Sequence, residues 1–178
     1  SGLGRNVLVP PGCRALAFAV LGIPRGDGER MWPPKLEARV VQELELDRND
    51  VVLEIGTSSG YLTALLGRCC AAVTSVEIIT RLSAEAAPKL SRAGIGNTRL
   101  EVGDGARGWG DRQYDALVLT GATPVLPDSW SQPHKPGAPL FAVVGQPPVL
   151  TARPVRWTAP GAVATARVPR TGSVPVRN

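Results

Sequence analysis

The sequence predicts an α/β fold, a doubly wound and mostly parallel sheet with helices on both faces. Three observations predict it: short apolar runs rich in β-branched residues, segments with apolar residues at helical spacing, and the alternation of the two from residue 34 to about residue 144. A parallel strand needs a crossover connection, usually a helix, to return to the same end of a sheet. The alternation therefore indicates parallel pairing.

The first elements are predicted in residues 34–78. A Pro33–Pro34 pair can open a helix whose apolar and charged residues fall on opposite faces. The apolar positions are Leu36, Val40, Val41 and Leu44, and the charged positions are Glu37, Arg39, Glu43 and Glu45. Residues 51–55 (VVLEI) are a predicted buried strand, and after a loop at 56–60 a helix at 61–70 leads to a strand at 73–78.

The alternation continues with a helix at 80–93, which Gly94 ends. Strands are predicted at 98–102, 116–120 and 140–144. We expect one domain over residues 1–150, in which residues 1–33 are irregular and rich in Gly and Pro. Residues 151–178 are predicted to be a basic, Pro-containing tail with one edge strand near 152–158 and little regular structure beyond it.

The chain has 178 residues and a formal net charge of +5, which raises the question of a polyanionic partner. The whole excess lies in residues 151–178, which hold five arginines and no acidic residue, so the body is neutral and neither nucleic acid nor a membrane is expected as a partner. The apolar run at 15–23 is shorter than the roughly 20 residues of a membrane span. A single histidine predicts no metal site, and the odd count of three cysteines suits free thiols in a reducing cytoplasm.

Chemistry is expected in the loops that follow the strands, because open α/β sheets bind ligands outside the carboxyl ends of their strands. The loop after residues 51–55 has the sequence GTSSG, in which Gly56 permits a sharp turn and a close backbone approach to a ligand. Glu77 follows Gly56 by 21 residues, an offset at which a carboxylate accepts hydrogen bonds from ribose hydroxyls. A nucleoside-containing ligand is therefore predicted. A dinucleotide is disfavoured because its glycine pattern is broken by Ser58 and Tyr61.

Five ordered motifs carry a family resemblance: VVLEIGTSSGYLTALLG, VTSVEI, LEVGDGARGW, YDALVLTGA and HKPGAPLFAVVG. They resemble those of the protein-L-isoaspartate O-methyltransferases, which are class I methyltransferases with a Rossmann-like sheet. The resemblance runs from about residue 8 to residue 149. It implies S-adenosyl-L-methionine as cofactor, S-adenosyl-L-homocysteine as product, and methyl transfer to the carboxylate of isoaspartyl residues in damaged proteins, a repair reaction.

The resemblance also implies roles for individual residues. Glu54 and the backbone of the loop would hold the methionine half of the cofactor, and Glu77 would hold the ribose. The loop positions concerned are Gly56, Thr57, Ser58 and Gly60. Asp104 and Gly105 would meet the adenine, and residues 1–33 would supply a segment that covers cofactor and substrate.

Three positions depart from the family pattern. Trp32 stands where the family has its essential active-site Ser, Ser58 stands where it usually has Gly, and the sequence Gly-Ala-Pro at 137–139 replaces a usual Gly-Gly pair. The departure at Trp32 leaves a second hypothesis open, a cofactor-binding relative with a changed acceptor or without catalysis. A nicotinamide-dependent oxidoreductase and a nucleic-acid methyltransferase are weaker alternatives, because the first lacks its glycines and the second a basic face.

Overall fold

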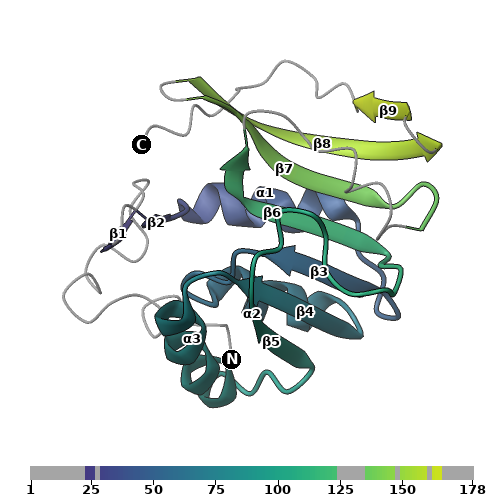
Figure 1. Ribbon diagram of the computed structural model, residues 1–178. Helices are drawn as coiled ribbons and strands as arrows, with labels where there is room; N and C mark the ends of the chain where they lie inside the picture. Colours follow the sequence, from purple (N-terminus) through teal and green to yellow (C-terminus); the bar gives the residue numbers. More distant parts are fainter. Residues whose placement is uncertain (1–22, 27–28, 124–134, 147–148, 160–161, 166–178) are drawn as a thin grey trace.

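The computed structural model describes residues 23–26, 29–123, 135–146, 149–159 and 162–165, and these form two sheets (Figure 1). Strands β1 (Ile23–Gly26) and β2 (Glu29–Met31) pair as a small antiparallel sheet. The main sheet has seven strands in the order β5-β4-β3-β6-β7-β8-β9. Its strands are β3 (Val51–Ile55), β4 (Ala72–Glu77), β5 (Thr98–Val102), β6 (Ala116–Thr123), β7 (Pro139–Gln146), β8 (Val149–Ala159) and β9 (Ala162–Thr165).

Five strands of this sheet, β5, β4, β3, β6 and β7, run parallel, which confirms the predicted Rossmann-like α/β class. The chain proceeds outward from β3 through β4 to β5, then returns to the other side of β3 to form β6. The strand order thus reverses between β3 and β6. Such a switch point opens a ligand crevice at the carboxyl ends of the strands.

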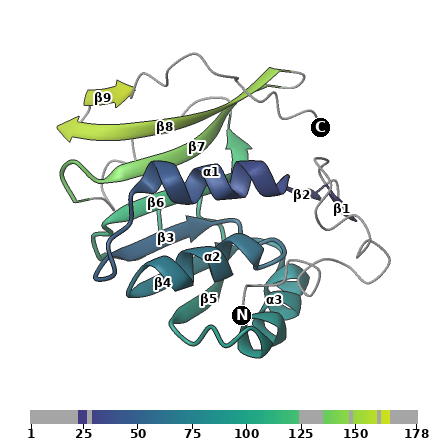
Figure 2. The ribbon, with the colours of Figure 1, turned by 180° about the vertical axis from the view of Figure 1, so that it is seen from behind.

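The three helices among the described residues, α1 (Pro34–Leu44), α2 (Tyr61–Cys69) and α3 (Thr80–Arg92), cover one face of the sheet. Strand register pairs Glu54 with Ser75 and Ser75 with Leu100, so these three side chains share a face. Leu100 packs in a cluster with Ala64 of α2 and Leu90 of α3, and Figure 2 shows α1 and α2 on the near side of the sheet. The connections β3-α2-β4 and β4-α3-β5 are consecutive crossovers in the same direction along the sheet, and with the usual right-handed sense they place α2 and α3 on the same face.

On the opposite face, the described residues include no helix. Within the described residues, the connection from β5 to β6 is a glycine-rich loop at 103–115, and its Tyr114 and Trp109 pack over Leu53, Leu117 and Leu140. Two aromatic rings thus cover apolar strand residues on this face. Residues 124–134, in the next connection, lie outside the described part of the chain.

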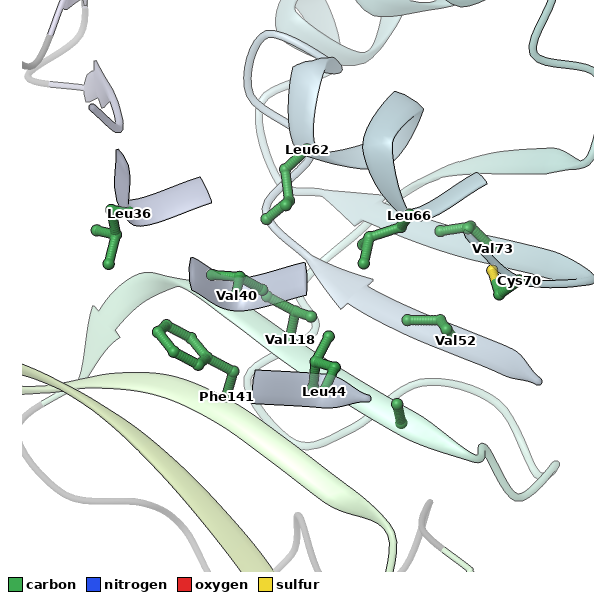
Figure 3. Close-up of a cluster of buried hydrophobic side chains, with 11 residues drawn as sticks. Leu36, Val40, Leu44, Val52, Leu62, Leu66, Cys70, Val73, Val118 and Phe141 are labelled. Carbon is green, nitrogen blue, oxygen red and sulfur yellow. The ribbon is translucent and has the colours of Figure 1, made fainter. Parts of the chain in front are cut away.

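The main core lies between the helices and the sheet (Figure 3). It contains Leu36, Val40, Leu44, Val52, Leu62, Leu66, Cys70, Val73, Ala116, Val118 and Phe141. The predicted helix at the start of this region is confirmed as α1, but the prediction that Glu37 lies on its solvated face is wrong, since Glu37 is 3% exposed. Glu37 shares the face of Val40 and Leu44 because it precedes them by three and seven positions on a helix with a 3.6-residue period.

The carboxyl-terminal region also differs from the prediction. Residues 152–158, where one edge strand was expected, lie within β8, which pairs antiparallel with β7 on one side and with β9 on the other. The expected little-structured tail thus contributes two strands to the main sheet. An antiparallel partner needs only a tight connection, so this extension leaves no sign of helical alternation in the sequence. Residues 1–22 and 166–178 lie outside the described part.

Candidate functional site

The loop between β3 and α2 turns sharply by placing three residues at positive φ. Gly56 has φ 100°, Ser58 has φ 47° and Gly60 has φ 79°. The amide of Gly56 donates to the carbonyl of Val76 over 2.7 Å, and the amide of Gly60 donates to the carbonyl of Thr57 over 2.9 Å. The loop is therefore fixed both to the neighbouring strand β4 and within itself, at the switch point of the sheet.

Gly56 is required by the packing as well as by its φ. A Cβ at this position would lie 2.0 Å from Oγ1 of Thr120, which is in the carboxyl-terminal half of β6. The Thr120 hydroxyl donates to the carbonyls of Ile55 and Gly56, at 3.0 and 2.8 Å. Thr120 thus fixes the start of the loop from the other side of β3. Sequence analysis missed this residue because the contact spans 64 and 65 positions.

Glu54 occupies the buried end of a hydroxyl network beneath the loop. Its Oε2 accepts hydrogen bonds from Thr63 Oγ1 at 2.6 Å and Ser75 Oγ at 2.7 Å, and Ser75 Oγ lies 2.6 Å from Thr57 Oγ1. Since the Ser75 proton points to Glu54, the Thr57 hydroxyl donates to Ser75. The side chain of Glu54 is 0% exposed, and burial raises its pKa to about 7 against the opposing effect of the two hydroxyls. Among the described residues, its Oε1 has no hydrogen-bond partner.

Glu77 at the end of β4 holds the loop from the neighbouring strand. Its Oε2 accepts the amide of Ser58 at 2.8 Å and its Oε1 accepts the amide of Ile79 at 3.0 Å. Each carboxylate oxygen keeps a second lone pair, so both can still accept one hydroxyl proton. A pair of adjacent hydroxyls such as those of a ribose matches this geometry.

The end of β5 completes the edge beside Glu77. The amide of Gly103 donates to the carbonyl of Glu77 at 3.0 Å, and Asp104 Oδ1 accepts the amide of Ala106 at 2.9 Å. Gly105 is buried against Ile55, because a Cβ there would lie 2.6 Å from Ile55 Cδ1. Asp104 is exposed and Gly105 lines the loop behind it, so both lie at the same edge of the sheet as Glu77.

An apolar surface lies beside these polar groups, and sequence analysis did not single it out. Ile78 is 66% exposed and Val102 is 49% exposed, the largest exposures of big apolar side chains among the described residues. Both stand where the adjacent strands β4 and β5 end, since Glu77 pairs with Val102. An apolar surface next to a ribose acceptor is suited to contact a flat base.

The predicted loop residues divide into two groups. Thr57 is 2% exposed and Gly60 is buried against α3, with the site of a Cβ 3.1 Å from Ala86 Cβ, so both support the loop from inside. Gly56 and Ser58 are half-buried and form its outer side. The structure thus brings Gly56, Ser58, Glu77, Asp104 and Gly105 to one edge of the sheet, with Glu54 beneath it.

Trp32 contacts the main hydrophobic core. It is half-buried just before α1, packs on the main core, and meets Phe141 edge to face with ring centroids 6.3 Å apart and an interplanar angle of 62°. This geometry is typical of a stabilising aromatic pair. Its described role is packing, while Leu36 and Leu62, near the starts of α1 and α2, share the same cluster (Figure 3).

In the part of the chain that the structure describes, no group of three or more His, Cys, Asp or Glu side chains is arranged to bind a metal ion. The single histidine, at position 134, lies outside that part. None of the described helices is both long and apolar enough to cross a membrane. The site consists of backbone amides, three acidic side chains and an apolar surface, which together suit a nucleoside ligand with a charged extension.

The chain is similar in sequence to proteins named protein-L-isoaspartate O-methyltransferase. The sequence profile of the Protein-L-isoaspartate(D-aspartate) O-methyltransferase (PCMT) family matches residues 3–175. Protein-L-isoaspartate O-methyltransferase 1 of Anaeromyxobacter sp. (strain Fw109-5) is 38% identical over 148 residues, which cover 82% of this chain and 70% of that protein. The protein-L-isoaspartate O-methyltransferase of Methanoculleus marisnigri is 37% identical over 142 residues, which cover 79% of this chain and 64% of that protein.

Solved structures show the same fold. A protein-L-isoaspartate O-methyltransferase superposes with a TM-score of 0.74 at 24% identity, over 88% of this chain and 53% of that one. A Plasmodium falciparum protein described as a putative protein-L-isoaspartate O-methyltransferase, in complex with S-adenosyl-L-homocysteine, gives a TM-score of 0.72 at 13% identity, over 97% and 85%.

The family assignment rests on the sequence matches and the fold on the structures. The chain spans 58% to 70% of the lengths of the first four relatives that it matches. The chain belongs to the protein-L-isoaspartate(D-aspartate) O-methyltransferase family of S-adenosyl-L-methionine-dependent methyltransferases, so the family, the enzyme class and the cofactor expected from the sequence are confirmed.

Proposed function

We propose that this chain transfers a methyl group from S-adenosyl-L-methionine to the carboxylate of isoaspartyl residues in damaged proteins, and so takes part in protein repair. The observation that carries the proposal is the Glu77 carboxylate, which accepts the amides of Ser58 and Ile79 and keeps one lone pair on each oxygen. This acceptor stands beside the glycine loop at the switch point of a sheet with the family's fold.

The cofactor would be held by residues at the carboxyl ends of β3, β4 and β5. Glu77 would accept the ribose hydroxyls, and Ile78 with Asp104 and Gly105 would surround the adenine. Gly56 and Ser58 would approach the methionine half, which carries an ammonium and a carboxylate. Glu54 fits beneath that half, because its Oε1 is a buried acceptor that lacks a partner among the described residues and an ammonium would provide donors for it.

The bound cofactor supplies an electrophilic methyl group on a sulfonium. An isoaspartyl carboxylate is already ionised at neutral pH, so the chain needs no general base to activate it. What the residues of this chain contribute is position, because alignment of reacting groups alone lowers a barrier by several kcal/mol, about 7–11 at most. The pinned loop, held by Thr120 on one side and Glu77 on the other, suits that task.

Trp32 decides between this function and its alternative, a family member with a changed acceptor. A serine hydroxyl can donate to or accept from a substrate carboxylate, whereas an indole offers only its N–H. The test is base-labile methyl incorporation into an isoaspartyl peptide, with the matching aspartyl peptide as control. We expect incorporation into the isoaspartyl peptide only.

Two variants separate packing from chemistry at this position. Trp32→Ser restores the hydroxyl, and Trp32→Phe keeps a ring against Phe141 without the indole N–H. If the native chain and the Phe variant methylate neither peptide while the Ser variant methylates the isoaspartyl one, the native chain has a different acceptor or has lost catalysis. Activity of the native chain on the isoaspartyl peptide supports the repair function directly.

We propose further that residues 1–150 carry the cofactor site, with residues 1–33 covering it, and that residues 151–178 contribute charge without touching the cofactor. The described site residues all precede residue 121, which supports this division. Removal of residues 159–178 is expected to lower the isoelectric point and leave S-adenosyl-L-homocysteine binding in place. Loss of that binding on calorimetric titration would assign the segment to the site.

We propose the cytoplasm as its location, since Cys69 and Cys70 are both free thiols, as is usual in a reducing compartment. Isoaspartyl proteins or peptides are the proposed partners, and nucleic acid and membranes are not. Mass spectrometry after alkylation of freshly lysed cells checks the redox state of the two thiols, and an oxidised pair would contradict the cytoplasmic assignment.

A further inference from the structure

Ser58 combines two unfavourable features that a glycine at the same position would avoid. Its φ of 47° lies in the left-handed region, where a side chain with a Cβ is strained. Its Oγ is buried and has no hydrogen-bond partner among the described residues. Both features destabilise the loop unless another molecule makes use of the hydroxyl.

The fold of the loop does not account for the hydroxyl. The structural hydrogen bond of this residue is made by its backbone amide, which donates to Glu77 Oε2 at 2.8 Å. Its neighbour Ser59 is different, because Ser59 Oγ accepts the amide of Tyr61 at 3.2 Å and thus contributes to the start of α2. The hydroxyl of Ser59 therefore has a structural role within the loop, whereas the hydroxyl of Ser58 has none among the described residues.

We infer that the Ser58 hydroxyl donates a hydrogen bond to the carboxylate at the amino-acid end of the cofactor, an inference that rests on the proposed function. The hydroxyl is a buried donor without a partner among the described residues, in a half-buried residue whose amide binds Glu77, and rotation about χ1 turns the hydroxyl toward a ligand without moving the backbone. The carboxylate is an anion that accepts such a bond. Glu54 Oε1, the unpartnered acceptor under the same loop, complements the ammonium of that end.

The test uses two ligands that share the thioadenosine part and differ in the amino-acid end. S-adenosyl-L-homocysteine carries the amino-acid end, and 5′-methylthioadenosine has the same nucleoside without it. Two variants are compared: Ser58→Ala removes the hydroxyl and keeps the strained Cβ, and Ser58→Gly removes both. Ser59→Ala is the matched control, since it removes a hydroxyl from the same loop.

Calorimetric titration is expected to show both Ser58 variants binding S-adenosyl-L-homocysteine about tenfold more weakly, the usual effect of one lost hydrogen bond to a charged group. Their affinity for 5′-methylthioadenosine stays at the native value. The Tm rises in Ser58→Gly and rises less in Ser58→Ala, because only glycine removes the strain. Ser59→Ala lowers the Tm and weakens neither ligand selectively.

Two results overturn the inference: native or tighter affinity of Ser58→Ala for S-adenosyl-L-homocysteine, and an equal loss of affinity for both ligands. The first would show that the hydroxyl makes no contact, and the second that it acts on the nucleoside or on the loop. A native chain that binds neither ligand would overturn the proposed function itself, which the comparison of variants alone cannot do.

Discussion

The hydroxyl of Ser75 donates a hydrogen bond of 2.7 Å to Oε2 of Glu54, and the two residues are register partners on adjacent parallel strands. Ser75 in turn accepts the hydroxyl proton of Thr57 in the glycine loop. One side chain of β4 thus connects the buried carboxylate of β3 to the loop that follows it. The glycine loop is supported by a residue that precedes the predicted ribose acceptor by only two positions.

Ser75→Ala is expected to lower the free energy of unfolding by about 1–3 kcal/mol, because it removes one donor from a buried carboxylate and one acceptor from Thr57. Urea denaturation at neutral pH measures the change. Thr74→Ala is the matched control, since Thr74 is the half-buried neighbour on the opposite face of β4. Equal losses in the two variants would contradict a specific role of Ser75.

Glu54 makes stability depend on pH in a direction opposite to that of most carboxylates. Its folded pKa of about 7 lies above the ordinary value of 4.5, so between these values the folded state keeps a proton that the unfolded state has lost. Its contribution to stability is therefore neutral below pH 4.5, falls as the pH rises, and reaches its full penalty above pH 7.

Glu54→Gln removes this titration. We expect the variant to gain at most about 3 kcal/mol over the native chain at pH 8 and nothing at pH 4, on the basis of 1.4 kcal/mol per pKa unit. Urea denaturation across pH 4–8 follows the difference. A gain that does not vary with pH would show that burial of the charged form is not its cause.

Gly56→Ala is expected to destabilise the fold strongly, since the new Cβ would lie 2.0 Å from Thr120 Oγ1 at a φ of 100°. In Thr120→Ala the nearest atom of residue 120 is instead the Cβ, at 3.4 Å, so the double variant should recover the steric part of the loss. The cost of the positive φ, of the order of 1–2 kcal/mol, remains. A double-mutant cycle of thermal unfolding measures the coupling, and additive losses would contradict the steric explanation.

Asp115 is expected to stabilise the fold at the amino ends of the strands. Burial acts to raise its pKa, but the hydrogen bonds from Lys135 and the Val51 amide outweigh that effect and hold the pKa below its ordinary value. A lowered carboxyl pKa contributes stability above the unfolded value near 3.8, and that stability disappears as the pH falls through the folded value.

Asp115→Asn should therefore be less stable than the native chain at pH 7, and the difference should shrink in acid. The loss is expected to stay near 1 kcal/mol, because Lys135 is half exposed and solvent weakens such a pair. Lys135→Gln, which leaves the Val51 bond intact, should cost less. Denaturation midpoints at pH 7 and pH 3 give both comparisons, and a difference that grows in acid would refute the assignment.

The local sequence determined the elements whose hydrophobic period is unambiguous. The strand at residues 51–55 was predicted with the bounds that the structure has, and the helix predicted to open at the Pro33–Pro34 pair is confirmed as α1, because turn residues or prolines flank clear apolar patterns. The candidate site was located for the same kind of reason. Glycines at a strand end and an acidic residue at a fixed offset are local in sequence.

The tertiary structure decided which side chains support that site and which elements close the sheet. The partners of the loop and of Glu54 come from 9 to 65 positions away, namely Thr63, Ser75 and Thr120. The strands β8 and β9 and the burial of Glu37 likewise depend on pairing and packing between distant segments. Periodicity reports which face of an element is apolar, whereas a hydrogen bond or a register depends on where another segment lies, and that is fixed only when the chain has folded.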